Sequence, residues 1–166
     1  MLYNGTAWSG QLLKLARYRD TIDGFTLLNK ATASISYGVD LGVQTRCYRC
    51  IIVGAGSNAT GATMRAALCE FIGNVVTGWA TGVMFGSSQP GLSVMNNIIT
   101  KCTNGFSSVS SVLGFFYNNI SVGNTTSNWP TQPTALEGAD MNAGLTGQAW
   151  VTGRTGRCLV GDNFGL

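Results

Sequence analysis

Apolar and polar residues alternate along this chain in short runs, and the runs recur at a nearly constant interval. Residues 73–77, 96–100 and 118–122 each place an asparagine directly before β-branched residues, at offsets of 23 and 22. Moving back 24 residues from Val75 reaches Ile51, and a further 26 reaches Phe25. Five segments therefore share one position in a repeat, and a repeat must be recognised before any other structural assignment is made.

Two further series run in step with the first. One pairs glycine with an apolar residue at intervals of 21 to 23: Gly38-Val39, Gly61-Ala62, Gly82-Val83 and Gly105-Phe106. The other contains Cys47, Phe71, Val94 and Phe116. Three short β-like runs per repeat are typical of a solenoid, in which coils stack at the ~4.8 Å strand spacing and bury what one coil cannot. The pattern predicts an all-β parallel β-helix of about five coils.

Stacking places equivalent residues of successive coils in columns along the solenoid axis. We expect one inward-facing apolar column, made of Phe25, Ile51, Val75, Ile98 and Ile120. A second column, of Asn74, Asn97 and Asn119, is expected to form a ladder at a corner, with amides hydrogen-bonded from coil to coil.

The repeats resemble those of a known class of solenoid. Residues 22–29 (IDGFTLLN), 96–106 (NNIITKCTNGF) and 118–129 (NNISVGNTTSNW) are similar to the right-handed parallel β-helix repeats of pectate-lyase-like proteins and of phage tail or tailspike proteins. The resemblance implies a right-handed, single-stranded β-helix that often works as a homotrimer. It implies no particular activity, because function depends on a site and not on a fold.

The resemblance covers 22–129 and leaves two end segments. We expect 1–21 to form an N-terminal cap or edge coil, in which residues 12–15 are either a strand or a short capping helix. Residues 130–166 are expected to form a C-terminal cap or assembly element, because the open ends of a solenoid need covering.

Composition restricts the class of function. Of the 166 residues, 45% are apolar and only 10% are charged, against roughly 25% in typical globular proteins. The net charge is +3 and the basic residues are scattered, which argues against nucleic acid as a partner. No stretch approaches the ~20 apolar residues of a membrane-spanning helix, and no secretory signal is recognisable at the N-terminus.

Candidate cofactor and metal motifs are incomplete. The chain has no histidine, which excludes Ser–His and Cys–His nucleophiles. Its five cysteines include one CxxC, Cys47 and Cys50, which is a poor zinc site without a second pair, so core positions are expected. Residues 51–59 contain GxGxxA after a strand-like run but lack the acidic residue about 20 positions later that a dinucleotide fold uses. We therefore expect neither a cofactor nor a metal.

The remaining candidates for a site are charged and aromatic. Alignment of the coils places Asp20, Arg46 and Glu70 in one outward stripe, which is either a solvated ladder of ion pairs or a catalytic site. Trp79, Tyr117 and Trp129 are candidates for glycan contact through ring stacking, with packing as the alternative. Pectate-lyase-like enzymes bind calcium through clustered carboxylates, and no such cluster occurs in this sequence.

Three functions remain open. The leading hypothesis is a structural, virion-associated module of a phage tail, spike or decoration protein, on a virion or extracellular surface and with contact to surface glycans. The alternatives are a polysaccharide lyase or glycoside hydrolase of the β-helix class and a carbohydrate-binding module without catalysis. An apolar patch along the helix would favour assembly, and carboxylates converging in one groove would favour an enzyme.

Overall fold

The computed structural model describes residues 2–4, 10–29, 35–55, 59–86, 90–108, 114–127 and 142–143, and all regular structure within them is β-strand. The strands form three sheets, A, B and C, whose neighbours all pair in parallel. Sheet A contains β1 (Leu2–Asn4), β4 (Thr26–Asn29), β7 (Ile51–Val53), β10 (Val75–Thr77), β13 (Ile98–Thr100), β16 (Asn119–Val122) and β17 (Asn142–Ala143). Sheet B contains β2 (Gly10–Leu15), β5 (Ile35–Leu41), β8 (Thr60–Met64), β11 (Thr81–Phe85) and β14 (Asn104–Ser108). Sheet C contains β3 (Thr21–Asp23), β6 (Arg46–Tyr48), β9 (Glu70–Ile72), β12 (Leu92–Met95) and β15 (Gly114–Tyr117).

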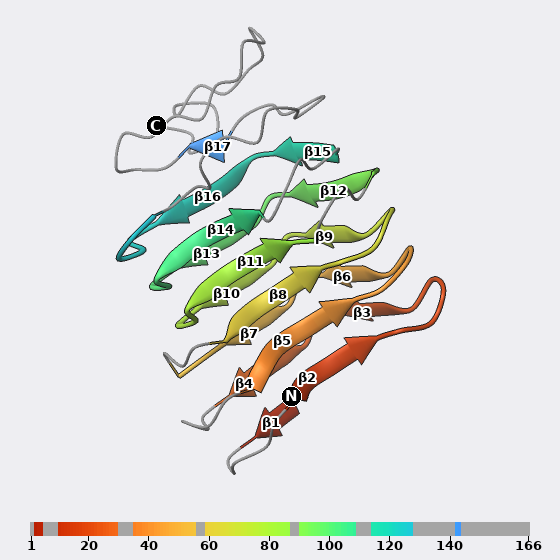
Figure 1. The fold of residues 1–166 in the computed structure, drawn as a ribbon, viewed down its shortest axis with the longest axis horizontal. Coiled ribbons are helices and arrows are strands. Elements are labelled where there is room, and N and C mark those ends of the chain that lie inside the picture. Colours follow the sequence, from red (N-terminus) through yellow and green to blue (C-terminus); the bar gives the residue numbers. More distant parts are fainter. Residues whose placement is uncertain are drawn as a thin grey trace, which may run out of the picture.

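From β1 to β16, successive strands belong to different sheets, so the chain visits sheets B, C and A in turn and then returns to B. Figure 1 shows the resulting layers, which begin with β2–β4 and stack one above another to β14–β16. The fold is a parallel β-solenoid in which the chain makes about four turns between the first of these five layers and the last, so the number of turns differs slightly from the five coils expected. The predicted all-β solenoid is confirmed.

The N-terminal segment contributes strands to the solenoid, which corresponds to the edge coil among the two alternatives considered for residues 1–21. Residues 12–15 lie within β2, which pairs with β5 as an ordinary member of sheet B, so this segment is a strand and not a capping helix. At the other end, β17 continues sheet A beyond β16. The rest of 130–166, which was expected to form a cap or assembly element, lies outside the described residues.

The apolar column of sheet A faces the opposite way to our expectation. The register aligns Leu27, Ile52, Val76 and Ile99, and each of these side chains is fully buried. The predicted inward residues lie one position earlier: Ile51 is 45% exposed and Ile98 39% exposed. The predicted column of Phe25, Ile51, Val75, Ile98 and Ile120 is therefore wrong in its facing, and Thr26, not Phe25, is the register partner of Ile51.

A ladder of asparagine side chains explains this facing. Asn74, Asn97 and Asn119 lie at the corner between sheets C and A, and all three are buried. The Oδ1 of Asn97 accepts from the backbone N–H and the Nδ2 of Asn74, at 2.9 and 3.1 Å, and the Oδ1 of Asn119 serves Asn97 in the same way. Because these residues point inward and strand side chains alternate, the next residue points outward and the one after it enters the core.

Each ladder amide also ties its layer to the one before. The Nδ2 groups donate to backbone carbonyls of the preceding layer: Asn74 to Cys47 at 3.0 Å, Asn97 to Phe71 at 2.7 Å and Asn119 to Val94 at 2.8 Å. The residue before each ladder position has a positive φ, as in Gly73 and Asn96, which turns the chain sharply into sheet A. The ladder therefore satisfies polar groups at a corner where no strand partner could reach them.

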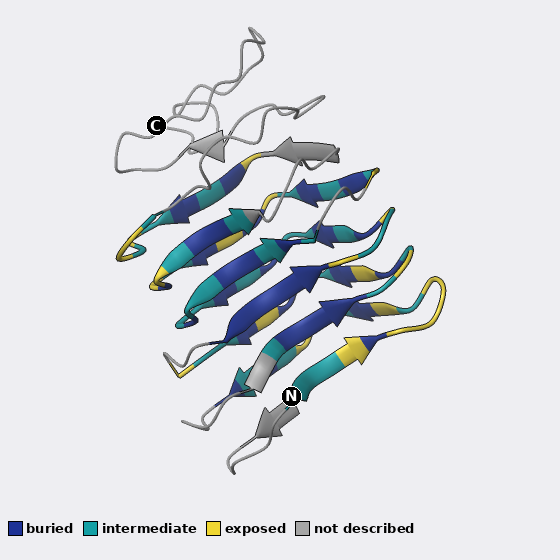
Figure 2. Ribbon diagram, viewed as in Figure 1, coloured by how far each residue is buried: buried dark blue, intermediate teal, exposed yellow. Residues whose placement is uncertain are grey.

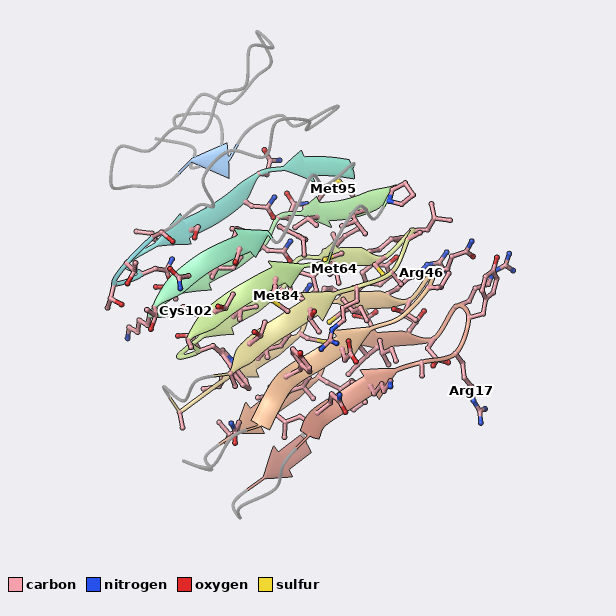
Figure 3. All side chains as sticks on the ribbon, in the orientation of Figure 1. Arg17, Arg46, Met64, Met84, Met95 and Cys102 are labelled. Carbon is pink, nitrogen blue, oxygen red and sulfur yellow. The ribbon has the colours of Figure 1, made fainter. Side chains whose placement is uncertain are left out.

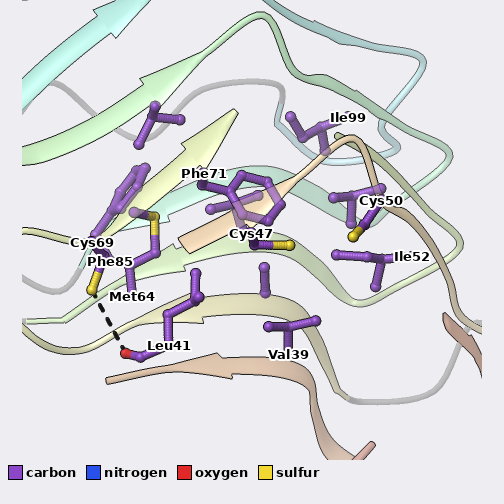
Figure 4. Close-up of a cluster of buried hydrophobic side chains, with 14 of the residues drawn as sticks. Val39, Leu41, Cys47, Cys50, Ile52, Met64, Cys69, Phe71, Phe85 and Ile99 are labelled. Carbon is purple, nitrogen blue, oxygen red and sulfur yellow. Dashed lines mark hydrogen bonds between the residues drawn. The ribbon is translucent and has the colours of Figure 1, made fainter. Parts of the chain in front are cut away.

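The core fills the space between the three sheets (Figure 2). Figure 4 shows Val39 and Leu41 of sheet B converging on Cys47 and Phe71 of sheet C and on Ile52 of sheet A. The glycine series lies where sheet B approaches sheet A most closely. A Cβ on Gly61 would come within 2.5 Å of Val76 Cγ1 and 2.7 Å of the Gly82 carbonyl oxygen, so only glycine fits there.

Removing one member of the ladder tests its contribution to stability. We expect Asn97→Ala to lower the free energy of unfolding by about 1–3 kcal/mol or more, because it removes the Asn97 partner of the buried Asn74 backbone N–H and of the Phe71 carbonyl, and one of the two partners of the Asn74 Nδ2. Thr103→Ala, at an exposed position, is the control and should cost less than about 0.5 kcal/mol. Chemical denaturation measures both. Equal stability of the two variants would contradict a structural role for the ladder.

Candidate functional site

The charged stripe expected from the sequence lies on the outward face of sheet C. Arg46 of β6 and Glu70 of β9 are register partners, and Arg46 Nε lies 3.3 Å from Glu70 Oε1. Both side chains are partly exposed, at 44% and 31%. Figure 3 places Arg46, like Arg17, on the side where the turns from sheet B to sheet C lie. An exposed pair of this kind contributes little to stability.

Asp20 is not a member of this column. The residue that aligns with Arg46 in the first layer is Thr21. Asp20 lies one position earlier and belongs to the turn: its Oδ2 accepts from the Arg17 backbone N–H at 2.9 Å. Its carbonyl oxygen accepts from the backbone N–H of Arg46. The predicted stripe of three charged side chains is therefore reduced to the pair Arg46–Glu70.

The structure adds three residues that the sequence alignment missed. Tyr48 lies two residues after Arg46, on the same face, and its hydroxyl donates to Glu70 Oε2. In register with Tyr48 lies Asp23, whose carboxylate pairs with Arg49 through Arg49 Nε at 2.7 Å and through a second contact from Nη2. Since side chains two apart on a strand share a face, the alternation within β3 and β6 was the signal that could have found Asp23 and Tyr48.

We call these five residues, Asp23, Arg46, Tyr48, Arg49 and Glu70, the sheet C cluster. The hydrogen bond from Arg49 holds the pKa of Asp23 below its usual value. Partial burial, followed by the hydrogen bond to Glu70, raises the pKa of Tyr48 to about 12. At neutral pH the phenol is therefore protonated and donates a hydrogen bond, and Asp23 is ionised. The cluster presents guanidinium and carboxylate groups beside an aromatic ring, which suits contact with a hydroxyl-rich ligand.

The raised pKa of Tyr48 predicts a defined alkaline transition. The folded-state pKa lies above the ordinary value near 10. The contribution of the protonated Tyr48 side chain to the stability of the folded state is therefore complete below pH 10 and is lost as pH rises through about 12. In a difference titration of tyrosinate absorbance between the wild type and Tyr48→Phe, the missing step should lie near pH 12. A step at the ordinary tyrosine value would contradict the Tyr48–Glu70 hydrogen bond.

A second polar group lies on the outward face of sheet B. The guanidinium of Arg65 lies over the ring of Tyr37, with Arg65 Cζ 4.0 Å from the ring centroid. Arg65 Nε also donates to Thr63 Oγ1 at 3.4 Å and lies 3.7 Å from Asp40 Oδ1. Asp40 lies on sheet B and Glu70 on sheet C, so these two carboxylates face different sides of the solenoid and do not flank one glycosidic bond. One face of the Tyr37 ring is covered and does not serve as a stacking platform.

Of the three aromatic candidates for glycan contact, the structure describes the side chain of Trp79. Trp79 is 1% exposed, and its indole Nε1 donates to the Ile52 carbonyl at 3.2 Å, so its ring is part of the core and not offered to a sugar. Tyr117 closes β15, where the structure describes its backbone and not its side chain. Trp129 lies outside the described residues.

Four of the five cysteines occupy the core. Cys47, Cys50, Cys69 and Cys102 are buried and free, as the sequence predicted for most of them, whereas Cys158 lies outside the described residues. The hydrogen bond between the Cys47 and Cys50 thiols raises the pKa of Cys47 and lowers that of Cys50 to about 7. Within the described ranges, no group of three or more Cys, Asp or Glu side chains is arranged to hold a metal ion.

The glycine-rich motif of residues 51–59 has a structural explanation. The glycine run after β7 leads into strand β8, not into the helix that a dinucleotide loop requires. In the part of the chain that the structure describes, there is also no helix of the length and apolar character needed to cross a membrane.

The outward face of sheet A presents a contiguous, uncharged and mainly aliphatic surface within the described residues. Its first column holds the register partners Thr26, Ile51, Val75, Ile98 and Ile120, and its second holds Leu28, Val53, Thr77, Thr100 and Val122. All ten are uncharged, and all ten are partly or fully exposed. We call these two columns the sheet A face. It was missed because its first column had been assigned to the interior.

Comparison with known proteins adds no assignment: no family model, no curated protein and no solved structure matches this chain.

Proposed function

We propose that this chain is a structural module of a larger assembly. The observation that carries the proposal is the sheet A face, an uncharged and mainly aliphatic surface that continues through five layers of the solenoid. Contiguous exposed apolar surface of this kind is characteristic of a contact between proteins. The distribution of charge agrees, because Lys101 is the only charged residue between Phe71 and Ser127.

The kind of assembly follows from the resemblance of the repeats. Phage tail and tailspike proteins use parallel β-helices as rigid structural parts, often as homotrimers. We therefore propose a virion-associated tail, spike or decoration module on a virion or extracellular surface, with the homotrimer as the expected state.

The oligomeric state and enzymatic activity can be measured on the same preparation. We expect the purified full chain to have the mass of three copies in light scattering or native mass spectrometry, and to leave polysaccharides uncleaved. A single-chain mass together with cleavage of any polysaccharide would contradict a structural role and favour the lyase or hydrolase alternative.

A glycan contact is a second candidate function, favoured by the sheet C cluster. The Tyr48 ring lies beside Arg46 and Glu70, and all three side chains are at least partly exposed. An enzyme would need two carboxylates directed at one bond. The two carboxylates of this cluster, Asp23 and Glu70, are each engaged with an arginine. Binding without cleavage is therefore the better-supported role of this surface.

Retention on a glycan panel tests this second role. We expect retention of at least one hydroxyl-rich polysaccharide, and we expect Tyr48→Ala to weaken it about tenfold, since loss of a stacked ring and its hydroxyl costs on the order of 1–2 kcal/mol. Thr103→Ala, which lies outside the cluster, should bind like the wild type. If the wild type is not retained, or if both variants bind equally well, the glycan contact is refuted.

A further inference from the structure

The sheet A face is uncharged along its whole length and mainly aliphatic, although it lies on the outside of the molecule. Ile51 is 45% exposed and Ile98 is 39% exposed, and Phe25, which precedes β4, is 45% exposed. Each of these side chains would gain from burial against a partner, because transfer of apolar surface out of water is favourable. The interior of the solenoid does not need them, since Ile52, Val76 and Ile99 already fill it.

Charge separates this face from the other two. Sheet C carries Arg46 and Glu70 on its outward side, and the outward side of sheet B carries Lys14 and Asp40 as register partners. When two identical charged faces meet about a symmetry axis, like charges can be brought together, which is unfavourable. The ten residues of the sheet A face include no charged side chain, so two copies of this face can meet without such a cost.

The spacing of the face favours the same partner. Its side chains repeat from layer to layer at the spacing of paired strands, about 4.8 Å, and two sheets pack face to face at about 10 Å by interdigitating such rows. A globular surface has no matching period, whereas a second copy of this chain has the same period over the same number of layers. β-branched rows of identical sequence interdigitate closely when sheets meet in this way.

We propose that copies of this chain pack against one another around a common axis, with the sheet A face of each copy turned towards the sheet A faces of the others, an arrangement that three copies can adopt. The inference rests on the proposed assembly function and names its partner: the surface is covered by another copy of the same chain. The contact buries Ile51, Val75 and Ile98 at its centre. The charged outward faces of sheets B and C remain at the periphery, where the sheet C cluster stays accessible to a glycan.

Two matched double variants of the full chain test this assignment. Ile51→Asp with Ile98→Asp places charges in the sheet A face, and Thr21→Asp with Ser93→Asp places the same charges on outward positions of sheet C. Light scattering over a concentration series should give a multi-chain mass for the wild type and the sheet C variant, and a single-chain mass for the sheet A variant. Circular dichroism verifies that the β-structure is retained.

A cross-linking measurement gives an independent answer if the sheet A variant fails to fold. Val75 lies in the middle layer of the face, so Val75→Cys should form a disulfide between two copies under mild oxidation, whichever way the copies run. Ser93→Cys, on sheet C, should not. Absence of the Val75→Cys dimer under conditions where the wild type is multi-chain would overturn the proposal.

The outcomes separate this inference from the function on which it rests. If the wild type is multi-chain and the sheet A variant keeps that mass, the inference fails while the assembly function stands on another surface. If the wild type has a single-chain mass at every concentration, the inference is overturned. If that monomer also cleaves a polysaccharide, the proposed function fails with it.

Discussion

The parallel, in-register stacking of successive layers is the constraint on which the rest of this structure depends. Each short strand finds its hydrogen-bonding partners only in the layers above and below, so one layer has no stable fold alone. The stacking persists because the corner from sheet C to sheet A is built alike in each layer. In each layer the buried residue of sheet C and the next buried residue of sheet A are separated by the same number of residues. The pairs are Cys47 and Ile52, Phe71 and Val76, and Val94 and Ile99. The asparagine ladder runs along this corner and keeps its three layers in register with one another.

Because equivalent residues stack on one another, the type of side chain at one position of the repeat determines the surface of a whole face. An outward aliphatic residue in one layer becomes a column when its register partners are alike, and this produces the sheet A face. On sheet C the equivalent positions are Thr21, Arg46, Glu70 and Ser93, so in this column the charged residues lie in the second and third layers. The solenoid therefore separates two kinds of surface, one suited to assembly and one suited to a polar ligand.

The sheet C cluster illustrates how pairing limits the chemistry of charged residues. The Tyr48 phenol has its pKa raised to about 12, while Arg49 stabilises the ionised form of Asp23. Both groups therefore keep one protonation state across the neutral range. A general acid or base works best with a pKa near the working pH. These two groups thus support hydrogen bonding to a ligand better than proton transfer.

The sequence by itself determined the repeat, the all-β solenoid and the asparagine ladder. These follow from the spacing of similar residues along the sequence. The structure keeps this spacing because the number of residues per turn sets the register between neighbouring strands. The tertiary structure alone decided three features. These are the facing of Ile51 and Ile98, the position of Thr21 instead of Asp20 beside Arg46, and the burial of Trp79. The physical reason is the two-residue alternation of a strand: an error of one position leaves every period intact and turns each side chain to the other face. Spacing cannot detect that error. The inward asparagines at the corner determine which side chains of sheet A enter the core and which remain on the outward face.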